Sequence, residues 1–282
     1  MLHVERDVAL RAARHAAEAI AQVRAAGFGV EYKDAAQDDP VTAADRASNA
    51  AIVASLREAF PNDVIVAEED DVPPGYPHAH RVWFVDPLDG TKEFVDGIGQ
   101  WCVMIGLAID GRAMMGVVVV PTLPLRDGDP AGYALVGEVG VGAWVVDASG
   151  AHHPLALGAP AEHIRVVTSR SRRSALLDAI FRELGGPREV RCGSVGVKVA
   201  LVLLGEVDAY IHPGGGPKLW DLCAPEAIVR AAGGAFTDER GAPIDYASPV
   251  VAHTTGMVAS ARELQGRLLD AVARGLASAG AG

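Results

Sequence analysis

Cysteine is scarce in this sequence, and the cysteines that are present do not form a recognisable pattern. Cys102, Cys192 and Cys223 are far apart, lie in apolar surroundings and show no C-x-x-C spacing. The sequence therefore predicts neither a zinc site nor a disulfide framework. We expect all three residues to be reduced and to lie in the core.

Long apolar runs are also missing. No run approaches the roughly 18 residues that a membrane-spanning helix needs, and the N-terminal stretch MLHVERDVALRAARHAAEAI carries charges throughout, unlike a signal peptide. We therefore expect a cytoplasmic protein without a membrane partner. Because half of the 282 residues are hydrophobic, the chain is expected to be globular and long enough for two subdomains.

Positive charge is in short supply and is nowhere concentrated. The chain has 25 basic and 36 acidic residues, which gives a formal net charge of −11. Without a basic stripe, a nucleic-acid polymer or an anionic membrane is not an expected partner. A small anionic substrate is still compatible with this charge if a bound metal supplies the positive charge.

The hydrophobic pattern changes its rhythm along the chain. Helices are predicted at 4–26 and 43–60, the second with Thr42 as its N-cap. Strands follow at 64–69, 81–86, 101–109, 113–120, 133–138 and 142–147, in an order that suggests an antiparallel meander. Strands at 164–169, 189–191 and 207–212 then alternate with helices at 172–184, 194–204, 221–232 and 261–278, which is an α/β pattern.

This change of pattern predicts two subdomains. Residues 1–157 should form an N-terminal α+β part with an antiparallel sheet and most of the candidate metal ligands. Residues 158–282 should form an α/β part that completes the site. The glycine-rich segment HPGGGPK (212–218) is too short for a linker and is interpreted as a mobile loop, and its His212 is a minor candidate for an acid.

The segment WFVDPLDGTKEFV places two negative charges where a buried strand ends. Asp86 and Asp89 flank Pro87-Leu88, and the chain turns at Gly90. Two aspartates three residues apart repel each other unless a cation lies between them. They are also common turn formers around proline and glycine, so the motif alone leaves both interpretations open.

Three further stretches carry acids that folding alone does not require. Glu68 and Glu69 close the strand VIVAEE, at the start of an acidic run that could be a solvated turn. Asp45 lies three residues after Thr42 and could complete a capping box. Asp221 precedes an apolar helix and could be its N-cap, with Pro225 in the first turn. A structural explanation for all four stretches at once is less convincing than for any one of them.

Together these residues predict a magnesium-dependent phosphatase site. Mg²⁺ prefers oxygen ligands in octahedral geometry, and carboxylates at strand ends with a free carbonyl at Leu88 are suitable. Two such ions can polarise a phosphoryl group and lower the pKa of a bound water. The amides of Gly90 and Thr91, at a turn that opens a short helix, would point donors at the phosphate.

Four motifs in this order resemble those of the inositol monophosphatase superfamily of lithium-sensitive, magnesium-dependent phosphomonoesterases. They are DPVTAADR, VIVAEE, WFVDPLDGTKEF and LWDLCAPEAIVRAAGG, and they span most of the chain between Ala43 and Asp238. The resemblance implies layered α-β-α-β-α architecture, with an α+β half, an α/β half and the site between them. It also implies a small phosphorylated substrate and often a homodimer.

The resemblance assigns roles to particular residues. Glu68, Asp86 and the Leu88 carbonyl resemble the ligands of a first metal, and Asp86, Asp89 and Asp221 those of a second. Two or three Mg²⁺ ions per site are implied, the third reached by Glu68 through water. Asp45 and Thr91 resemble the pair that positions and deprotonates the attacking water, with Glu68 counted among the catalytic residues. Gly90, Thr91 and Asp221 are expected to contact the substrate.

Within the superfamily, Lys92-Glu93-Phe94 after the D-G-T motif resembles the 3'(2'),5'-bisphosphate nucleotidases, which remove the 3'-phosphate of adenosine 3',5'-bisphosphate in sulfur metabolism. The segments SVGVK and TSRSRRS make Lys198 and Arg170 candidates for the 5'-phosphate, although both could be ordinary surface charges at helix ends. Two alternatives stay open: a phosphatase for inositol monophosphate or another sugar phosphate, and a metal-binding regulatory protein without turnover.

Overall fold

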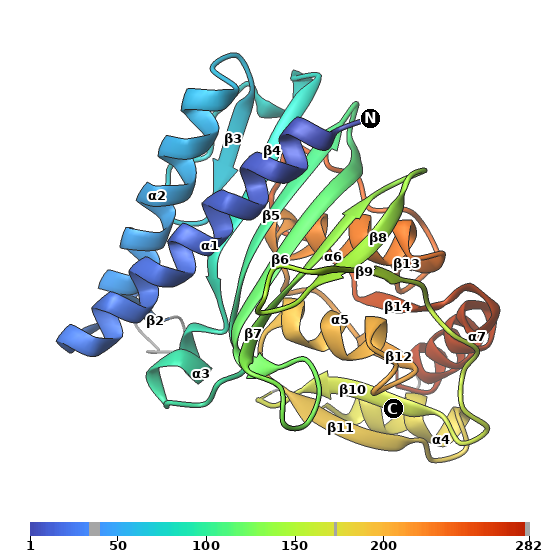
Figure 1. Ribbon diagram of the computed structural model, residues 1–282. Coiled ribbons are helices and arrows are strands. Elements are labelled where there is room, and N and C mark those ends of the chain that lie inside the picture. Colours follow the sequence, from blue (N-terminus) through green and yellow to red (C-terminus); the bar gives the residue numbers. More distant parts are fainter. Residues whose placement is uncertain (34–39, 172–173, 280–282) are drawn as a thin grey trace.

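The chain forms five layers in which two β-sheets alternate with three layers of helices (Figure 1). This computed structural model describes residues 1–33, 40–171 and 174–279. The layered αβαβα fold predicted from the sequence is confirmed. The sequence also predicts a polar loop in KDAAQDDP (33–40), and of this segment only Lys33 and Pro40 are described.

The first helical layer packs closely because one face of its longer helix is nearly all alanine. α1 (His3–Ala26) buries Ala9, Ala12, Ala13 and Ala16, and α2 (Ala43–Ala59) lies against it. Both helices cover one face of a seven-stranded sheet, where Trp83 and Val85 are fully buried. β1 (Val30–Tyr32) and β2 (Pro40–Thr42) form a small separate sheet before α2 and were not predicted.

The seven-stranded sheet is a meander with one exception. Its strands, in spatial order, are β3 (Val64–Ala67), β4 (Arg81–Asp89), β5 (Cys102–Ile109), β6 (Arg112–Pro124), β7 (Ala131–Glu138), β8 (Gly142–Val146) and β9 (His152–Leu155). β4 to β8 are antiparallel as predicted, and β9, which was not predicted, pairs antiparallel with β8, but β3 runs parallel to β4. The chain returns through a long connection that contains the 3-10 helix η1 (Tyr76–His78), so the prediction of a meander was wrong for β3.

The second sheet has five strands in the order β11-β10-β12-β14-β13. They are β10 (Arg165–Ser169), β11 (Arg188–Cys192), β12 (Ala209–His212), β13 (Gly234–Asp238) and β14 (Met257–Ala261). The first three are parallel, whereas β13 and β14, which were not predicted, pair antiparallel. α4 (Ala175–Glu183) and α7 (Arg262–Ala279) cover its outer face.

The middle layer consists of α5 (Val195–Leu203) and α6 (Leu219–Ala231), which lie between the two sheets (Figure 1). α6 rests directly on three glycines that are paired across adjacent strands, Gly106 with Gly116 and Gly116 with Gly137. A Cβ atom at Gly116 would lie 2.2 Å from the Ala224 carbonyl oxygen. The absence of side chains at these positions lets the helix backbone touch the sheet.

α6 starts two residues earlier than predicted, which changes two assignments. Asp221 is the third residue of the helix and not its N-cap, and Pro225 lies in the interior and not in the first turn. A proline here has no N–H to donate to the carbonyl of Asp221, four residues before it. Its tolerance is consistent with a helix that is held by packing on both sides.

The remaining predicted elements are present, with ends that move by up to four residues. The helix predicted at 172–184 begins at Ala175, and residues 172–173 lie outside the described part. The three cysteines are buried and free, as expected. The boundary predicted at 157/158 falls between β9 and β10, and the division into two subdomains stays a prediction. None of the described helices combines the length and apolarity needed to cross a bilayer.

Candidate active site

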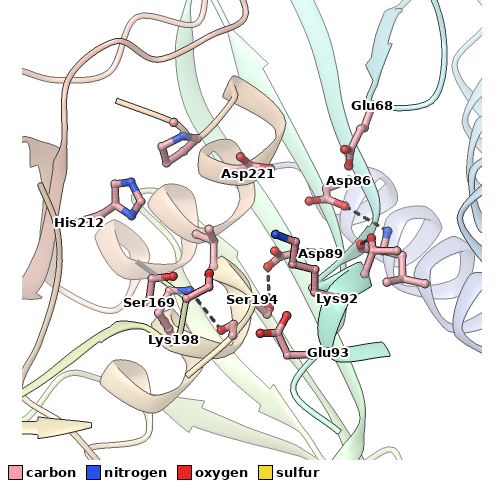
Figure 2. A pocket seen from close by; sticks show the side chains of 18 of the residues that line it. Glu68, Asp86, Asp89, Lys92, Glu93, Ser169, Ser194, Lys198, His212 and Asp221 are labelled. Carbon is pink, nitrogen blue, oxygen red and sulfur yellow. Dashed lines mark hydrogen bonds between the residues drawn. The ribbon is translucent and has the colours of Figure 1, made fainter. Parts of the chain in front are cut away.

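The acids singled out in the sequence converge on one pocket of about 250 Å³ between the two sheets (Figure 2). Glu68, Asp86, Asp89 and Asp221 lie on one side of the pocket, and Lys198 and His212 lie on the opposite side. Three of these side chains come from residues 68–89 and three from residues 198–221, more than 100 residues further along the chain. The pocket therefore exists only when both halves of the chain are folded together.

A bulge at the end of β4 shapes the acidic side. The pairing of β4 with β5 shifts register between Asp86 and Asp89, and the Leu88 N–H donates to Asp86 Oδ1 at 3.1 Å. The Pro87 carbonyl accepts a hydrogen bond of 2.6 Å from Ser48 Oγ on α2. Gly90 then adopts a φ of 94°, where any Cβ would lie 2.8 Å from the Gln100 carbonyl oxygen. The segment thus has turn-forming contacts in addition to its place in the pocket.

The other two acids come from a turn and from a helix start. Glu68 follows β3, which ends at Ala67 and not at residue 69 as predicted, and its carboxylate pairs with Lys33 Nζ at 3.1 Å. Glu69 pairs with the same ammonium group at 2.6 Å, so this run is not simply a solvated turn. Asp221 Oδ2 accepts the Lys218 N–H at 2.6 Å in the first turn of α6.

The gathered carboxylates disturb one another electrostatically. Burial raises the pKa of Asp86 well above its usual range, and the charges of Glu68, Asp89 and Asp221 raise it further. Burial and the charges of Glu68 and Asp89 raise the pKa of Asp221 to about 8. This site holds more negative charge than its protein partners neutralise, which is the condition that a cation relieves.

The donor set fits a hard divalent cation, because it consists of carboxylate oxygens without a histidine or cysteine among them. No three acidic, histidine or cysteine side chains among the described residues already stand in a coordination sphere. Two of the acids are held by other partners: Glu68 by Lys33, and Asp89 by Ser194.

Asp45 takes both roles considered for it. Its Oδ2 accepts the N–H and the hydroxyl of Thr42, each at 2.7 Å, which completes the capping box of α2. Its Oδ1 accepts the hydroxyl of Thr91 at 3.0 Å. Thr91 also lies 3.0 Å from the Leu88 carbonyl and opens the short helix α3 (Thr91–Val95). The carboxylate is buried and fixed, and it faces the pocket only through Thr91.

The two basic candidates differ in their positions. Lys198 is 3% exposed and lines the pocket, so the interpretation as a surface charge is wrong for it. Its Nζ donates to the Gly193 carbonyl at 3.1 Å and lies 5.2 Å from the centre of the Tyr210 ring. Burial lowers its pKa, against the opposing effect of Asp89. Arg170 is exposed, does not line the pocket and donates to Gln100.

His212, a minor candidate in the sequence, ends β12 and is buried against the pocket near Tyr210. Two serines of the pocket were not identified from the sequence. Ser169 and Ser194 line the wall formed by the second half. The only signal for Ser194 was its place before an apolar helix, which predicts a cap but not the direction of its hydroxyl. Trp220, which precedes Asp221, is buried in the core between the sheets.

Comparison with known proteins agrees with this architecture. The model of the inositol monophosphatase family matches residues 1–276. The 3'(2'),5'-bisphosphate nucleotidase CysQ of Escherichia coli K12 is 35% identical over 244 residues, covering 85% of this chain and 93% of the relative. The crystal structure of CysQ from Bacteroides thetaiotaomicron is 26% identical, with a TM-score of 0.72 and coverage of 92% and 97%. An inositol monophosphatase from Thermotoga maritima has the same fold, with a TM-score of 0.77 at 23% identity over 99% of both chains.

The chain therefore belongs to the inositol monophosphatase family. The predicted class of enzyme, a phosphoric monoester hydrolase, is confirmed with it.

Proposed function

We propose that this enzyme is a Mg²⁺-dependent phosphomonoesterase that removes the 3'-phosphate of adenosine 3',5'-bisphosphate. The observation that carries the proposal is the pocket itself, in which four carboxylates face a buried lysine across a space suited to an anion bridged by cations. The relatives named as 3'(2'),5'-bisphosphate nucleotidases support the substrate. The family as a whole supports dependence on a metal.

The residues that would hold the ions are Glu68, Asp86 and the Leu88 carbonyl on one side, and Asp86, Asp89 and Asp221 on the other. When bound, Mg²⁺ supplies Lewis-acid stabilisation of the phosphoryl oxygens and a lower pKa for water in the site. The number of ions, two or three, stays a prediction. The carboxylates of Asp86, Asp89 and Asp221 and the Leu88 carbonyl are each held by a backbone or hydroxyl contact, whereas Glu68 is held by Lys33.

The chain's own contribution to water activation lies in the pair Thr91 and Asp45. A water in the pocket can donate to Thr91 Oγ1 while the hydroxyl donates its own proton to Asp45 Oδ1, 3.0 Å away. Thr91 alone is a poor base, but Asp45 is held in place by two hydrogen bonds from Thr42 and needs no rearrangement. The water is thereby oriented toward the phosphorus.

Lys198 supports a substrate with a second phosphate. Its ammonium is almost fully buried in the wall opposite the carboxylates, and the hydrogen bond recorded for it goes to a neutral carbonyl. Among the described residues no ion pair joins this ammonium to a carboxylate, although Glu93 also lines the pocket and its charge acts on Lys198. A buried cation of this kind favours binding of an anion. Arg170, exposed at the rim beside Ser169 and Ser171, is a weaker candidate.

The test is phosphate release, with Mg²⁺, from adenosine 3',5'-bisphosphate and from inositol 1-phosphate at matched concentrations. A preference of a hundredfold or more for the nucleotide supports the proposal. If inositol 1-phosphate is hydrolysed as well or better, the site chemistry stands and the substrate assignment fails. No release from either substrate, with Mg²⁺ still bound, would favour a regulatory protein. The predicted homodimer and cytoplasmic location stay predictions.

A further inference from the structure

Ser194 has a backbone conformation that its residue type rarely adopts. Its φ is 50° and its ψ is 129°. Only one other non-glycine residue in the described part of the chain has a positive φ, Asp110 in the tight turn between β5 and β6. Such strain persists only where the surroundings enforce it, and it tends to accumulate at functional sites. Ser194 lines the pocket directly before α5.

Two donors from the segment that begins at Ser194, and one from β5, meet at one oxygen atom. Ser194 Oγ donates to Asp89 Oδ2 at 2.6 Å, and the Gly196 N–H donates to the same atom at 2.7 Å. The thiol of Cys102 lies 3.6 Å from it. Figure 2 shows the bond from Ser194 reaching Asp89 across the boundary between the two halves.

This arrangement distinguishes the two oxygens of Asp89. All hydrogen bonds recorded for its side chain in the described residues end on Oδ2. Oδ1 is therefore the oxygen that can bind a cation shared with Asp86 and Asp221. The negative charge of Asp89 already raises the pKa of both of these carboxyls. A carboxylate with one oxygen tied cannot rotate away from its neighbours when like charges repel it.

We propose that Ser194 is a positioning residue that holds Asp89 so that Oδ1 faces the cation, and that the strain at residue 194 is retained for this role. The inference rests on the proposed function, since it concerns the same site. It adds a residue that the sequence did not suggest. It also includes the buried thiol of Cys102 among the groups that contact Asp89 Oδ2. Partners of this kind affect metal affinity by about 10–100-fold in other proteins.

A purely structural role for Ser194 has to be separated from this one, because its hydroxyl also caps α5. It accepts the Val197 N–H at 3.1 Å. Ser174 is a matched control: its hydroxyl accepts the Leu177 N–H at 3.1 Å and caps α4, a helix that, like α5, has nine residues. Ser174→Ala removes the same kind of cap without touching Asp89.

The experiment measures the Mg²⁺ concentration that gives half of the metal-induced rise in Tm, without substrate, for the wild type, Ser194→Ala, Ser194→Gly and Ser174→Ala. We expect both Ser194 variants to need about tenfold more Mg²⁺ or higher, and Ser174→Ala to match the wild type. In EDTA, Ser194→Gly should melt no lower than Ser194→Ala, because glycine adopts a φ of 50° without strain. If Ser194→Ala does not fold, Ser194→Gly carries the test.

A wild-type midpoint in the Ser194 variants, or an equal shift in Ser174→Ala, overturns the positioning role. Phosphate release by the wild type, measured in parallel, keeps this failure apart from that of the proposed function. A wild type that hydrolyses its substrate while the Ser194 variants bind Mg²⁺ normally refutes the inference alone. A wild type that neither responds to Mg²⁺ nor releases phosphate refutes both.

Discussion

Gly116→Ala tests whether the contact of α6 with the sheet determines the position of Asp221. Gly116 lies in the middle of β6, opposite Gly106 and Gly137 on the neighbouring strands. An added Cβ would lie 2.2 Å from the Ala224 carbonyl oxygen and 2.8 Å from its Cα. All the crowding atoms belong to the helix backbone, so no side chain can rotate out of the way.

The size of the disturbance follows from these distances. Ordinary contact of a Cβ begins at 3.4 Å, so α6 has to withdraw by about 1.2 Å or the strand has to bend by as much. Overpacking of this kind costs about 1–3 kcal/mol, and about 2 kcal/mol corresponds to a loss of roughly 4–8 °C in Tm for a chain of this size. Asp221 lies in the first turn of α6 and moves with it.

We expect Gly116→Ala to reduce the rate of catalysis more than it reduces the stability of the fold. A misplacement of about 1 Å in a catalytic array can reduce the rate about a hundredfold. We therefore expect kcat/KM for the preferred substrate to fall by about that factor, and the Mg²⁺ requirement to rise, at a temperature well below the Tm of the variant. The measurements are steady-state phosphate release over a Mg²⁺ series and a thermal melt.

Gly75→Ala is the control, because Gly75 has a negative φ and no heavy atom within 4 Å of the added Cβ. It should retain the wild-type rate and Tm. Wild-type turnover and Mg²⁺ dependence in Gly116→Ala would refute the reasoning. A lower Tm with unchanged Mg²⁺ dependence would show that the sheet yields and that α6 stays in place.

Four other outcomes are expected. Asp89→Asn should remove most of kcat while the fold stays intact, and near-normal turnover in that variant contradicts its assignment as a metal ligand. Lys198→Ala should raise KM for adenosine 3',5'-bisphosphate more than for a monophosphate; equal effects on both remove the lysine from the second phosphate site. Chelation of Mg²⁺ should abolish activity and millimolar lithium should inhibit it, so full activity in EDTA or resistance to lithium counts against the proposed metal chemistry. Burial raises the pKa of Glu226 from 4.5 to about 6, against the opposing hydrogen bond from Tyr246 and the charge of Arg230. Its contribution to stability is thus complete below about pH 4.5 and is lost as the pH rises through about 6, a decrease of roughly 2 kcal/mol in the free energy of unfolding. Urea unfolding of Glu226→Gln should lack this decrease, and an identical pH dependence in both proteins shows that another group causes it.

The acidic residues could be predicted because their motifs are local. Asp86 and Asp89 follow an apolar strand within a few residues, and Thr42 and Asp45 are close enough in sequence to predict the capping box that the structure contains. The burial of the cysteines follows from their apolar surroundings, whereas the five-layer order was implied by the resemblance to the inositol monophosphatase superfamily.

What the sequence did not reveal depends on contacts between distant segments. The parallel pairing of β3, the antiparallel strands β13 and β14 and the burial of Lys198 are decided by what packs against each segment. Ser194 and Asp89 are 105 residues apart, and Lys33 and Glu68 are 35 apart, so neither pair has a local signature. Arg170 differs from Lys198: it follows the pocket residue Ser169 in the sequence, but it is exposed and does not line the pocket.

The crowded carboxylates also bear on how long the protein survives. In the unfolded chain these four carboxylates are hydrated and, apart from the neighbours Asp86 and Asp89, far from one another. Folding brings them together at a cost in free energy, which the raised pKa values of Asp86 and Asp221 reflect. A cation that binds only the folded form repays this cost and adds stability that grows with the logarithm of its concentration. Resistance to proteolysis should therefore follow the Mg²⁺ level of the surroundings, and a chain starved of the ion should be lost by degradation as well as by inactivity.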